Sequence, residues 1–255
     1  MRVLATYSIK GGVGKTTSAV NLADHAARTG WRVLVWDLDP QGAATFFLRV
    51  KPKIKGGARG LVGRRGALEP HVRASDVPGV HLLPADFSLR HLDVLLDVTP
   101  DSAGSGRARL GELLDPISDR YDVAILDCPP GITLGSESVF GAADALLVPT
   151  VPSTLSARTL EQLDDFLRAW PGAPRVLPFL TMVDRRRRMH RDVAAALIDA
   201  WPALLRTVVP SSASVERMGV ERAPLSAFAP RGVATSGYRD LWAEIADRLI
   251  TIGAP

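Results

Sequence analysis

The sequence has 255 residues, of which 46% are hydrophobic and 23% charged, with a formal net charge of +4 and a single cysteine, Cys128. This length fits one large α/β domain or two small ones, and the composition supports a sizeable buried core and argues against wholesale disorder. One cysteine excludes a disulfide within the chain and argues against a cysteine-ligated metal, so we expect a reducing cytoplasm and interpret Cys128 as a packing residue.

The first eight residues are largely apolar and lead directly into a glycine-rich turn. They lack the apolar core and small-residue cleavage site of a secretory signal, so we expect a first strand there. No run of about 18 apolar residues is present, so no transmembrane helix is expected.

Apolar segments of strand length alternate along the chain with helix-length periodic segments. The predicted strands are 3–7, 31–36, 80–83, 123–126, 145–148, 176–182 and 207–209. The predicted helices are 16–29, 86–97, 108–119, 154–169, 190–200 and 236–250, the last with Tyr238, Leu241, Trp242, Ile245 and Leu249 on one face. The alternation predicts a single α/β domain over residues 1–255, with a mostly parallel twisted sheet covered by helices on both faces.

Two segments interrupt this alternation. Residues 51–66 are rich in glycine and basic residues and predict a mobile loop, and residues 100–107 predict a flexible connection.

The turn between the first strand and the first helix reads Ser8-Ile-Lys-Gly-Gly-Val-Gly-Lys-Thr-Thr17. Its glycines allow successive backbone N–H groups to converge on phosphate oxygens, and the helix that follows presents its positive end to the same anion. In such a P-loop Lys15 reaches the β- and γ-phosphates and the Thr16 hydroxyl ligates Mg²⁺. The strict pattern has glycine at position 9, where this chain has Ile9 followed by Lys10. The turn predicts binding of ATP and Mg²⁺.

Acidic residues follow two of the predicted strands. The second strand ends in Trp36-Asp-Leu-Asp-Pro-Gln-Gly42, and four apolar residues precede Asp127 in Val123-Ala-Ile-Leu-Asp-Cys-Pro-Pro130. Acids at strand ends are also found as simple surface residues, but the P-loop upstream favours a metal role. Ligands of such sheets bind at the carboxyl ends of the strands. The second segment resembles a Walker B stretch, which implies that Asp127 holds Mg²⁺ through water.

These three segments together resemble the ParA/MinD family of ATPases with its deviant Walker A motif, and the likeness extends over nearly the whole chain. The resemblance implies that Lys10 reaches across a nucleotide-sandwiched homodimer to the partner's phosphates, where added positive charge assists hydrolysis. It implies that Asp39 orients or activates the attacking water and that Asp37 supports Mg²⁺ and the loop. The implied nucleotide-binding residues are Lys10, Gly11, Gly12, Val13, Gly14, Lys15, Thr16 and Thr17.

Two later segments also resemble the family, Leu180-Thr-Met-Val-Asp-Arg185 and Val209-Pro210. In relatives these regions lie near the adenine, so Asp184 and Pro210 are candidate adenine contacts; the alternative is that they are ordinary strand ends.

Positive charge is concentrated in two places. Between Arg49 and Arg73 eight lysines or arginines accompany one acid, Glu69, a local net charge of +7. The second cluster consists of Arg185, Arg186, Arg187, Arg188 and Arg191. Either patch suits a polyanion, and either also fits a merely solubilising surface.

The resemblance places the second cluster where relatives carry a DNA-contacting arginine. Ser211 and Ser212 stand where many relatives have arginine, and Arg217, Arg222 or the loop from Lys51 to Arg65 are candidates to replace it.

The chain most resembles short ParA-type ATPases that lack an operator-binding module. It is expected to dimerise on ATP, to bind DNA non-specifically on the nucleoid and to position a cargo. A ParB-like or cargo-adaptor protein would stimulate its slow hydrolysis. The ending Ile250-Thr-Ile-Gly-Ala-Pro255 lacks the basic amphipathic helix of MinD-type relatives, which disfavours a membrane role. The alternatives are an ATP-dependent ligase or amidotransferase of related fold, a membrane-associated MinD-like ATPase, and a localising module that binds partners without DNA.

Overall fold

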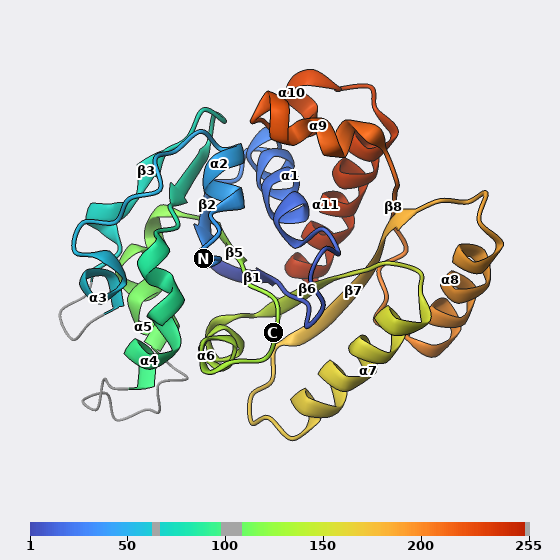
Figure 1. Cartoon of the computed structure of the whole chain (residues 1–255), viewed down its shortest axis with the longest axis horizontal. Helices are drawn as coiled ribbons and strands as arrows, with labels where there is room; N and C mark the ends of the chain where they lie inside the picture. Colours follow the sequence, from blue (N-terminus) through green and yellow to red (C-terminus); the bar gives the residue numbers. More distant parts are fainter. Residues whose placement is uncertain (63–66, 98–108, 253–255) are drawn as a thin grey trace.

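A computed structural model describes residues 1–62, 67–97 and 109–252. In these residues eight strands form one sheet in the order β3-β4-β2-β5-β1-β6-β7-β8 (Figure 1). The strands are β1 Arg2–Thr6, β2 Val33–Asp37, β3 Arg73–Ala74, β4 Val80–Leu83, β5 Val123–Asp127, β6 Ala145–Thr150, β7 Arg175–Val183 and β8 Val208–Pro210. Every pairing is parallel except that of β3 with β4. The predicted fold class is confirmed.

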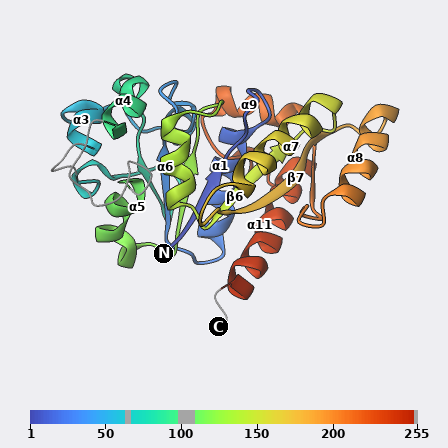
Figure 2. The same ribbon diagram turned by 90° about the horizontal axis from the view of Figure 1, so that it is seen from below.

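Helices cover the sheet on both faces (Figures 1 and 2). One face carries α1 Lys15–Arg28, α2 Ala43–Phe47, α9 Ala213–Glu221, α10 Leu225–Phe228 and α11 Val233–Ile252. The other carries α3 Gly57–Val62, α4 Leu92–Asp97, α5 Arg109–Leu114, α6 Leu134–Ala142 and α7 Thr154–Arg168, with α8 Arg188–Ala200 beside them. Short 3₁₀ helices within the described ranges are η1 Glu69–His71, η2 Phe87–His91 and η4 Asp115–Arg120.

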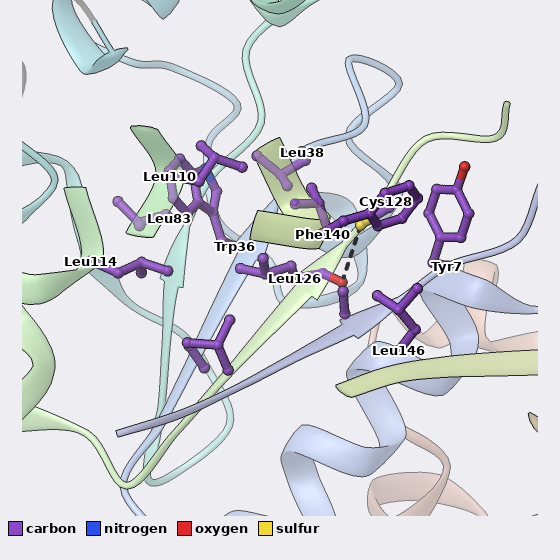
Figure 3. Close-up of a cluster of buried hydrophobic side chains, with 14 of the residues drawn as sticks. Tyr7, Trp36, Leu38, Leu83, Leu110, Leu114, Leu126, Cys128, Phe140 and Leu146 are labelled. Carbon is purple, nitrogen blue, oxygen red and sulfur yellow. Dashed lines mark hydrogen bonds between the residues drawn. The ribbon is translucent and has the colours of Figure 1, made fainter. Parts of the chain in front are cut away.

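The alternation of side chains along each central strand produces the two cores. Leu34 and Trp36 of β2 face the α4–α7 layer, whereas Val33 and Val35 face the α1–α11 layer, as successive strand residues must. Cys128 is buried in the first of these cores, where its Sγ lies 3.7 Å from the Leu126 carbonyl oxygen (Figure 3). The packing role expected for this cysteine fits that position.

The long C-terminal helix follows the expected pattern. Tyr238, Leu241, Trp242, Ile245 and Leu249 are all buried against the rest of the domain. None of the helices in the described ranges is both long and apolar enough to cross a bilayer.

The segment 51–66, expected to be a loop, differs in its described part. Residues Gly57–Val62 form α3, and Ile54, Ala58, Leu61 and Val62 are buried in the core. Four apolar residues among the glycines and lysines are enough to anchor the segment, so the expectation of a loop was wrong there. Residues 63–66 and the expected flexible connection 100–107 lie outside the described residues.

Two predicted helices are broken. The segment 86–97 divides into η2 and α4, and the predicted helix 108–119 divides into α5 and η4, whose first turn contains Pro116. Proline removes a backbone donor and crowds the preceding turn, which ends the α-helix there.

Candidate functional site

The carboxyl ends of the three adjacent strands β2, β5 and β1 bring the predicted motifs together. Thr6 of β1 lies beside Asp127 of β5 in the strand register, and Asp37 of β2 lies on the other side of Asp127. The chain leaves β1 through the glycine turn and enters α1 at Lys15. The turn and both acidic strand ends therefore share one edge of the sheet, where parallel sheets bind ligands.

The glycine turn has a backbone conformation that residues with a side chain would adopt only with strain. Gly12 and Gly14 have φ of 72° and 91°, a left-handed conformation that glycine adopts without strain. A Cβ on Gly14, the N-cap of α1, would also lie 3.4 Å from Cε of Met182. These glycines leave an open concave turn at the N-terminus of a 14-residue helix. Such a turn fits phosphate oxygens, which take the backbone N–H groups as donors.

Lys15 is almost entirely buried at this turn. Among the described residues its ammonium group makes one long hydrogen bond of 3.4 Å, to the Lys10 carbonyl oxygen. Burial lowers the pKa of Lys15, and the nearby carboxylates of Asp127 and Asp39 oppose that shift. An ammonium has three donors, so this one retains capacity for the oxygens of a bound phosphate.

Asp127 has the environment that best fits a bound cation. The side chain is fully buried; Oδ1 accepts a hydrogen bond of 3.3 Å from the Thr6 hydroxyl, and Oδ2 has no hydrogen-bond partner among the described residues. Burial raises the pKa of Asp127 well above its usual range, and the neighbouring Asp37 raises it further, while the Thr16 hydroxyl lowers it in part. A buried carboxylate oxygen without a partner beside a threonine hydroxyl fits Mg²⁺, which prefers oxygen ligands.

Asp37 has a different environment, because its oxygens are already engaged. Oδ2 accepts hydrogen bonds of 2.7 Å from both the backbone N–H and the hydroxyl of Thr45, and Oδ1 accepts one of 3.3 Å from the Asp39 backbone. Burial raises the pKa of Asp37 as well. The side chain therefore holds the loop between β2 and α2 in place; its support of Mg²⁺ stays a prediction.

Asp39 and Lys10 lie at the open side of the site. Both are half-buried; Asp39 Oδ1 accepts a hydrogen bond of 2.9 Å from the Gln41 backbone, and the Lys10 backbone donates to the Ser8 hydroxyl at 3.2 Å. The Lys10 ammonium forms no ion pair with any residue in the described ranges. The structure thus brings all predicted phosphate and metal residues to one edge of the sheet.

The two candidate adenine residues lie on the neighbouring strands. Val183 of β7 pairs with Pro210 of β8, and Asp184 follows directly. The Asp184 carboxylate pairs with Arg186 at 3.1 Å, and these hydrogen bonds lower the pKa of Asp184. Met182, which sequence reasoning passed over, lies against Gly14 with a left-handed φ of 54°. The apolar periodicity gave no sign of this bend at the end of β7.

The arginine cluster before and within α8 is fully exposed, and its members divide into two groups. Arg186 pairs with Asp184, Arg188 pairs with Asp192 at 3.5 Å, and Arg191 donates to the Arg185 carbonyl oxygen at 2.9 Å. Arg185 and Arg187 form no ion pair with any residue that the structure describes.

The two candidate replacements on α9 are engaged elsewhere. Arg217 pairs with Glu221 at 2.6 Å, and the Arg222 guanidinium lies 4.4 Å from the centre of the Phe46 ring. The first contact lies within α9, and the second ties the C-terminal end of α9 to α2.

A cavity of about 180 Å³ adjoins the site and was not predicted. It lies between the Asp39 loop, Cys128 and the start of α6, and Arg90 and Asp93 supply its charged groups. The Asp93 carboxylate accepts hydrogen bonds from the Gly135 backbone at 2.6 Å and the Thr133 hydroxyl at 3.1 Å. A single acid and a single arginine within helix-forming sequence offered no signal that could have placed them here.

Known proteins resemble this chain in sequence and in fold. Residues 1–170 match a family model described as an AAA domain. The chromosome-partitioning ATPase Soj of Thermus thermophilus is 32% identical, over 98% of this chain and 97% of the relative. A complex of a McdA variant from Cyanothece with ATP superposes with a TM-score of 0.81 at 25% identity, covering 96% of each chain. Cobyrinic acid a,c-diamide synthase of Mycobacterium smegmatis, with bound ADP and magnesium, gives 0.78 at 25% identity, covering 95% of this chain and 93% of the other.

Proposed function

We propose, from the premise that this chain belongs to the ParA/MinD family of P-loop ATPases, that it is a nucleotide-switched ATPase that positions a cargo on DNA. The observation that carries the proposal is the combination of the left-handed glycine turn, the buried Lys15 and the unpartnered Asp127 oxygen. Relatives and neighbours support it, since one is named as a chromosome-partitioning ATPase and another is a complex with ATP.

The chain's own residues divide the work of binding. The backbone N–H groups from Gly11 to Thr17 and the Lys15 ammonium hold the phosphates. Thr16 and Asp127 would hold Mg²⁺, which when bound neutralises charge on the phosphate oxygens. Asp37 keeps the loop in position through Thr45, and Asp39 on that loop positions the attacking water.

Lys10 completes the site of a second copy in this proposal. Its side chain is half-buried on the open side of the turn and has no counter-charge among the described residues. A lysine there can place its ammonium against the phosphates of a facing protomer, where negative charge develops during hydrolysis. The ATP-bound homodimer would be the active form, slow until a ParB-like or cargo-adaptor protein stimulates it.

Arg185 and Arg187 are the first candidates for contact with DNA phosphates, because no acid neutralises them among the described residues. The proposal expects ATP-dependent, sequence-independent binding to a DNA duplex that weakens steeply with salt. The double substitution Arg185→Glu and Arg187→Glu should abolish it at moderate salt. Arg73→Glu reverses the charge of an arginine on β3, at the opposite edge of the sheet, and should leave DNA binding unchanged. Binding that is equal in ATP and ADP would contradict the proposal.

A ligase or amidotransferase remains a second candidate because of one observation, the charged cavity beside Asp39. The likeness to cobyrinic acid a,c-diamide synthase adds to it. A ligase would hydrolyse ATP only with a small carboxylic acid and an amine donor, and DNA would have no effect. Loss of such turnover in Arg90→Ala, with nucleotide binding retained, would favour this reading over the first.

A MinD-like membrane role has less support. The apolar face of α11 is packed against α1 and the sheet, so that face is not free to enter a bilayer. We propose a cytoplasmic, nucleoid-associated protein.

A further inference from the structure

An open groove lies at the amino ends of the parallel strands, opposite the end that carries the nucleotide site. It has a volume of about 610 Å³ and is lined by residues at the start of β7, at the C-terminal ends of α7 and α8, and by Arg248 of α11. Figure 2 shows the three helices around β7. The glycine turn and Asp127 lie at the carboxyl ends of the strands, whereas Arg175 is the first residue of β7. A ligand in the groove would therefore not compete with nucleotide.

The floor of the groove is apolar. Leu167 of α7 and Leu177 of β7 are buried beneath it, and Val176 and Trp201 are half-buried at its surface. Trp201 follows α8 directly as its C-cap. A floor of this kind gains most from covering by a large apolar or aromatic side chain.

The rim of the groove is positively charged. Its lining includes the three cations Arg168, Arg175 and Arg248, and one acid, Asp164. Arg168 pairs with that acid at 2.7 Å, and its side chain is still 75% exposed.

The other two arginines differ in their partners. Arg248 pairs with Glu244 at 3.3 Å. Glu244 is itself held by the backbone N–H groups of Arg206 and Thr207, which lower its pKa. Arg175 forms no ion pair with any described residue, so its charge is available to a ligand.

We propose that this groove docks an acidic segment of a partner protein that carries a large apolar side chain. Carboxylates of the segment would pair with Arg175 and Arg168, and the apolar side chain would cover Trp201. A DNA duplex matches the charge, but its bases are stacked on one another and offer no apolar group to this floor, so the groove favours a peptide over a duplex. The inference does not depend on the ATPase cycle, because the groove is distant from the nucleotide.

The test uses the full chain, labelled with ¹⁵N, and two blocked synthetic peptides, GEELFEEG and GKKLFKKG. We expect the acidic peptide alone to shift the Trp201 indole resonance and the amides of 173–177 in a saturable way. Arg175→Glu should weaken binding by at least about tenfold, the loss expected when a close charge pair is reversed. Arg185→Glu, an exposed arginine outside the groove, is the matched control and should bind the peptide as the parent does.

Several results would overturn the proposal. One is the absence of shifts at Trp201, and another is equal binding of the lysine peptide. A third is an equal loss in Arg175→Glu and Arg185→Glu, which would mean general charge attraction. Displacement of the peptide by a 20-base-pair duplex, with DNA binding lost in Arg175→Glu, would assign the groove to DNA. If Arg175→Glu fails to fold, Arg168→Glu on the exposed side of α7 provides the same comparison.

Discussion

At the scale of single residues, the buried carboxyls of Asp127 and Asp37 make the apo protein sensitive to pH. Burial raises both pKa values, so the folded chain keeps these protons to higher pH than the unfolded chain does. The stability linked to them is fully present below the ordinary carboxyl pKa of about 4 and is lost as pH rises through the raised values. Mg²⁺ requires the ionised form, so its binding should strengthen over the same range.

Asp127→Asn has no proton to lose at this position. Relative to the parent, its free energy of unfolding without nucleotide or Mg²⁺ should therefore increase from pH 5 to pH 8. Urea denaturation at both pH values measures the difference. The contributions of distant titrating groups cancel, because parent and variant share them. A difference between variant and parent that does not change with pH would show that Asp127 is ionised throughout.

The two lysines of the turn should separate binding from hydrolysis. Lys15→Ala removes the buried ammonium and should weaken ATP binding by roughly 10- to 100-fold, the worth of one lost charge-assisted hydrogen bond. Lys10→Ala should bind ATP as the parent does but lose turnover. Calorimetric titration with a non-hydrolysable ATP analogue and a phosphate-release assay measure these effects. Lys53→Ala, an exposed lysine outside the site, is the control. Weakened nucleotide binding in Lys10→Ala would place Lys10 in its own protomer's site.

At the scale of elements, Thr45 is the residue that links three of them. Its backbone and hydroxyl bind Asp37 at the end of β2, and its hydroxyl also accepts the Ala85 backbone N–H at 2.8 Å, just after β4. Thr45→Val keeps the shape of the side chain but removes a hydrogen-bond partner from the buried Ala85 N–H and from the Asp37 carboxylate.

We expect Thr45→Val to lower the free energy of unfolding by about 2 kcal/mol, because unsatisfied buried polar groups cost that much. The Thr159 hydroxyl donates a hydrogen bond to the Ser156 carbonyl oxygen of its own helix. Thr159→Val should therefore change the free energy of unfolding by no more than about 0.5 kcal/mol. Chemical denaturation gives both values. Equal effects in the two variants would mean that the Asp37–Thr45–Ala85 connection contributes nothing beyond an ordinary threonine.

The central strands were predictable because each is a continuous apolar run. Val80–Leu83 agrees in both ends with the expectation, and β1, β2, β5, β6, β7 and β8 shift by at most two residues at an end. The short helices were not predictable. The five residues of α2 and the nine of α6 are too few for a clear apolar period, and α6 contains two glycines and two serines. Their formation depends on contacts with the sheet.

The same contrast holds within the site. The phosphate turn and Asp127 were predictable because backbone chemistry demands those residue types at that spacing. Met182, Arg90 and Asp93 were not, because only the packing of distant segments brings them to the site. The contact of Arg222 with the Phe46 ring also depends on tertiary structure, whereas the Arg217–Glu221 pair is a local i,i+4 pair within α9.

At the scale of the whole molecule, the sheet separates three surfaces. The proposed nucleotide site lies at the carboxyl ends of the central strands, Arg185 and Arg187 lie beside α8 near the β8 edge, and the groove with Trp201 lies at the opposite end of β7.

In the proposed function, nucleotide binding controls DNA binding through dimerisation. DNA binding by Asp39→Ala should therefore persist after ATP is added, while the parent releases DNA as it hydrolyses ATP; a filter-binding time course measures both. Equal release rates would remove Asp39 from the hydrolytic step.

The central claim is that Lys10 acts on the nucleotide of a facing copy, and a mixing experiment tests it directly. Lys10→Ala retains Asp39, and Asp39→Ala retains Lys10, so each variant alone should bind ATP without turnover. In a mixed dimer the Lys10→Ala protomer would receive Lys10 from its partner and hydrolyse its own ATP. We predict that an equimolar mixture releases phosphate well above the sum of the two separate rates. A mixture no faster than that sum would contradict the cross-dimer role of Lys10.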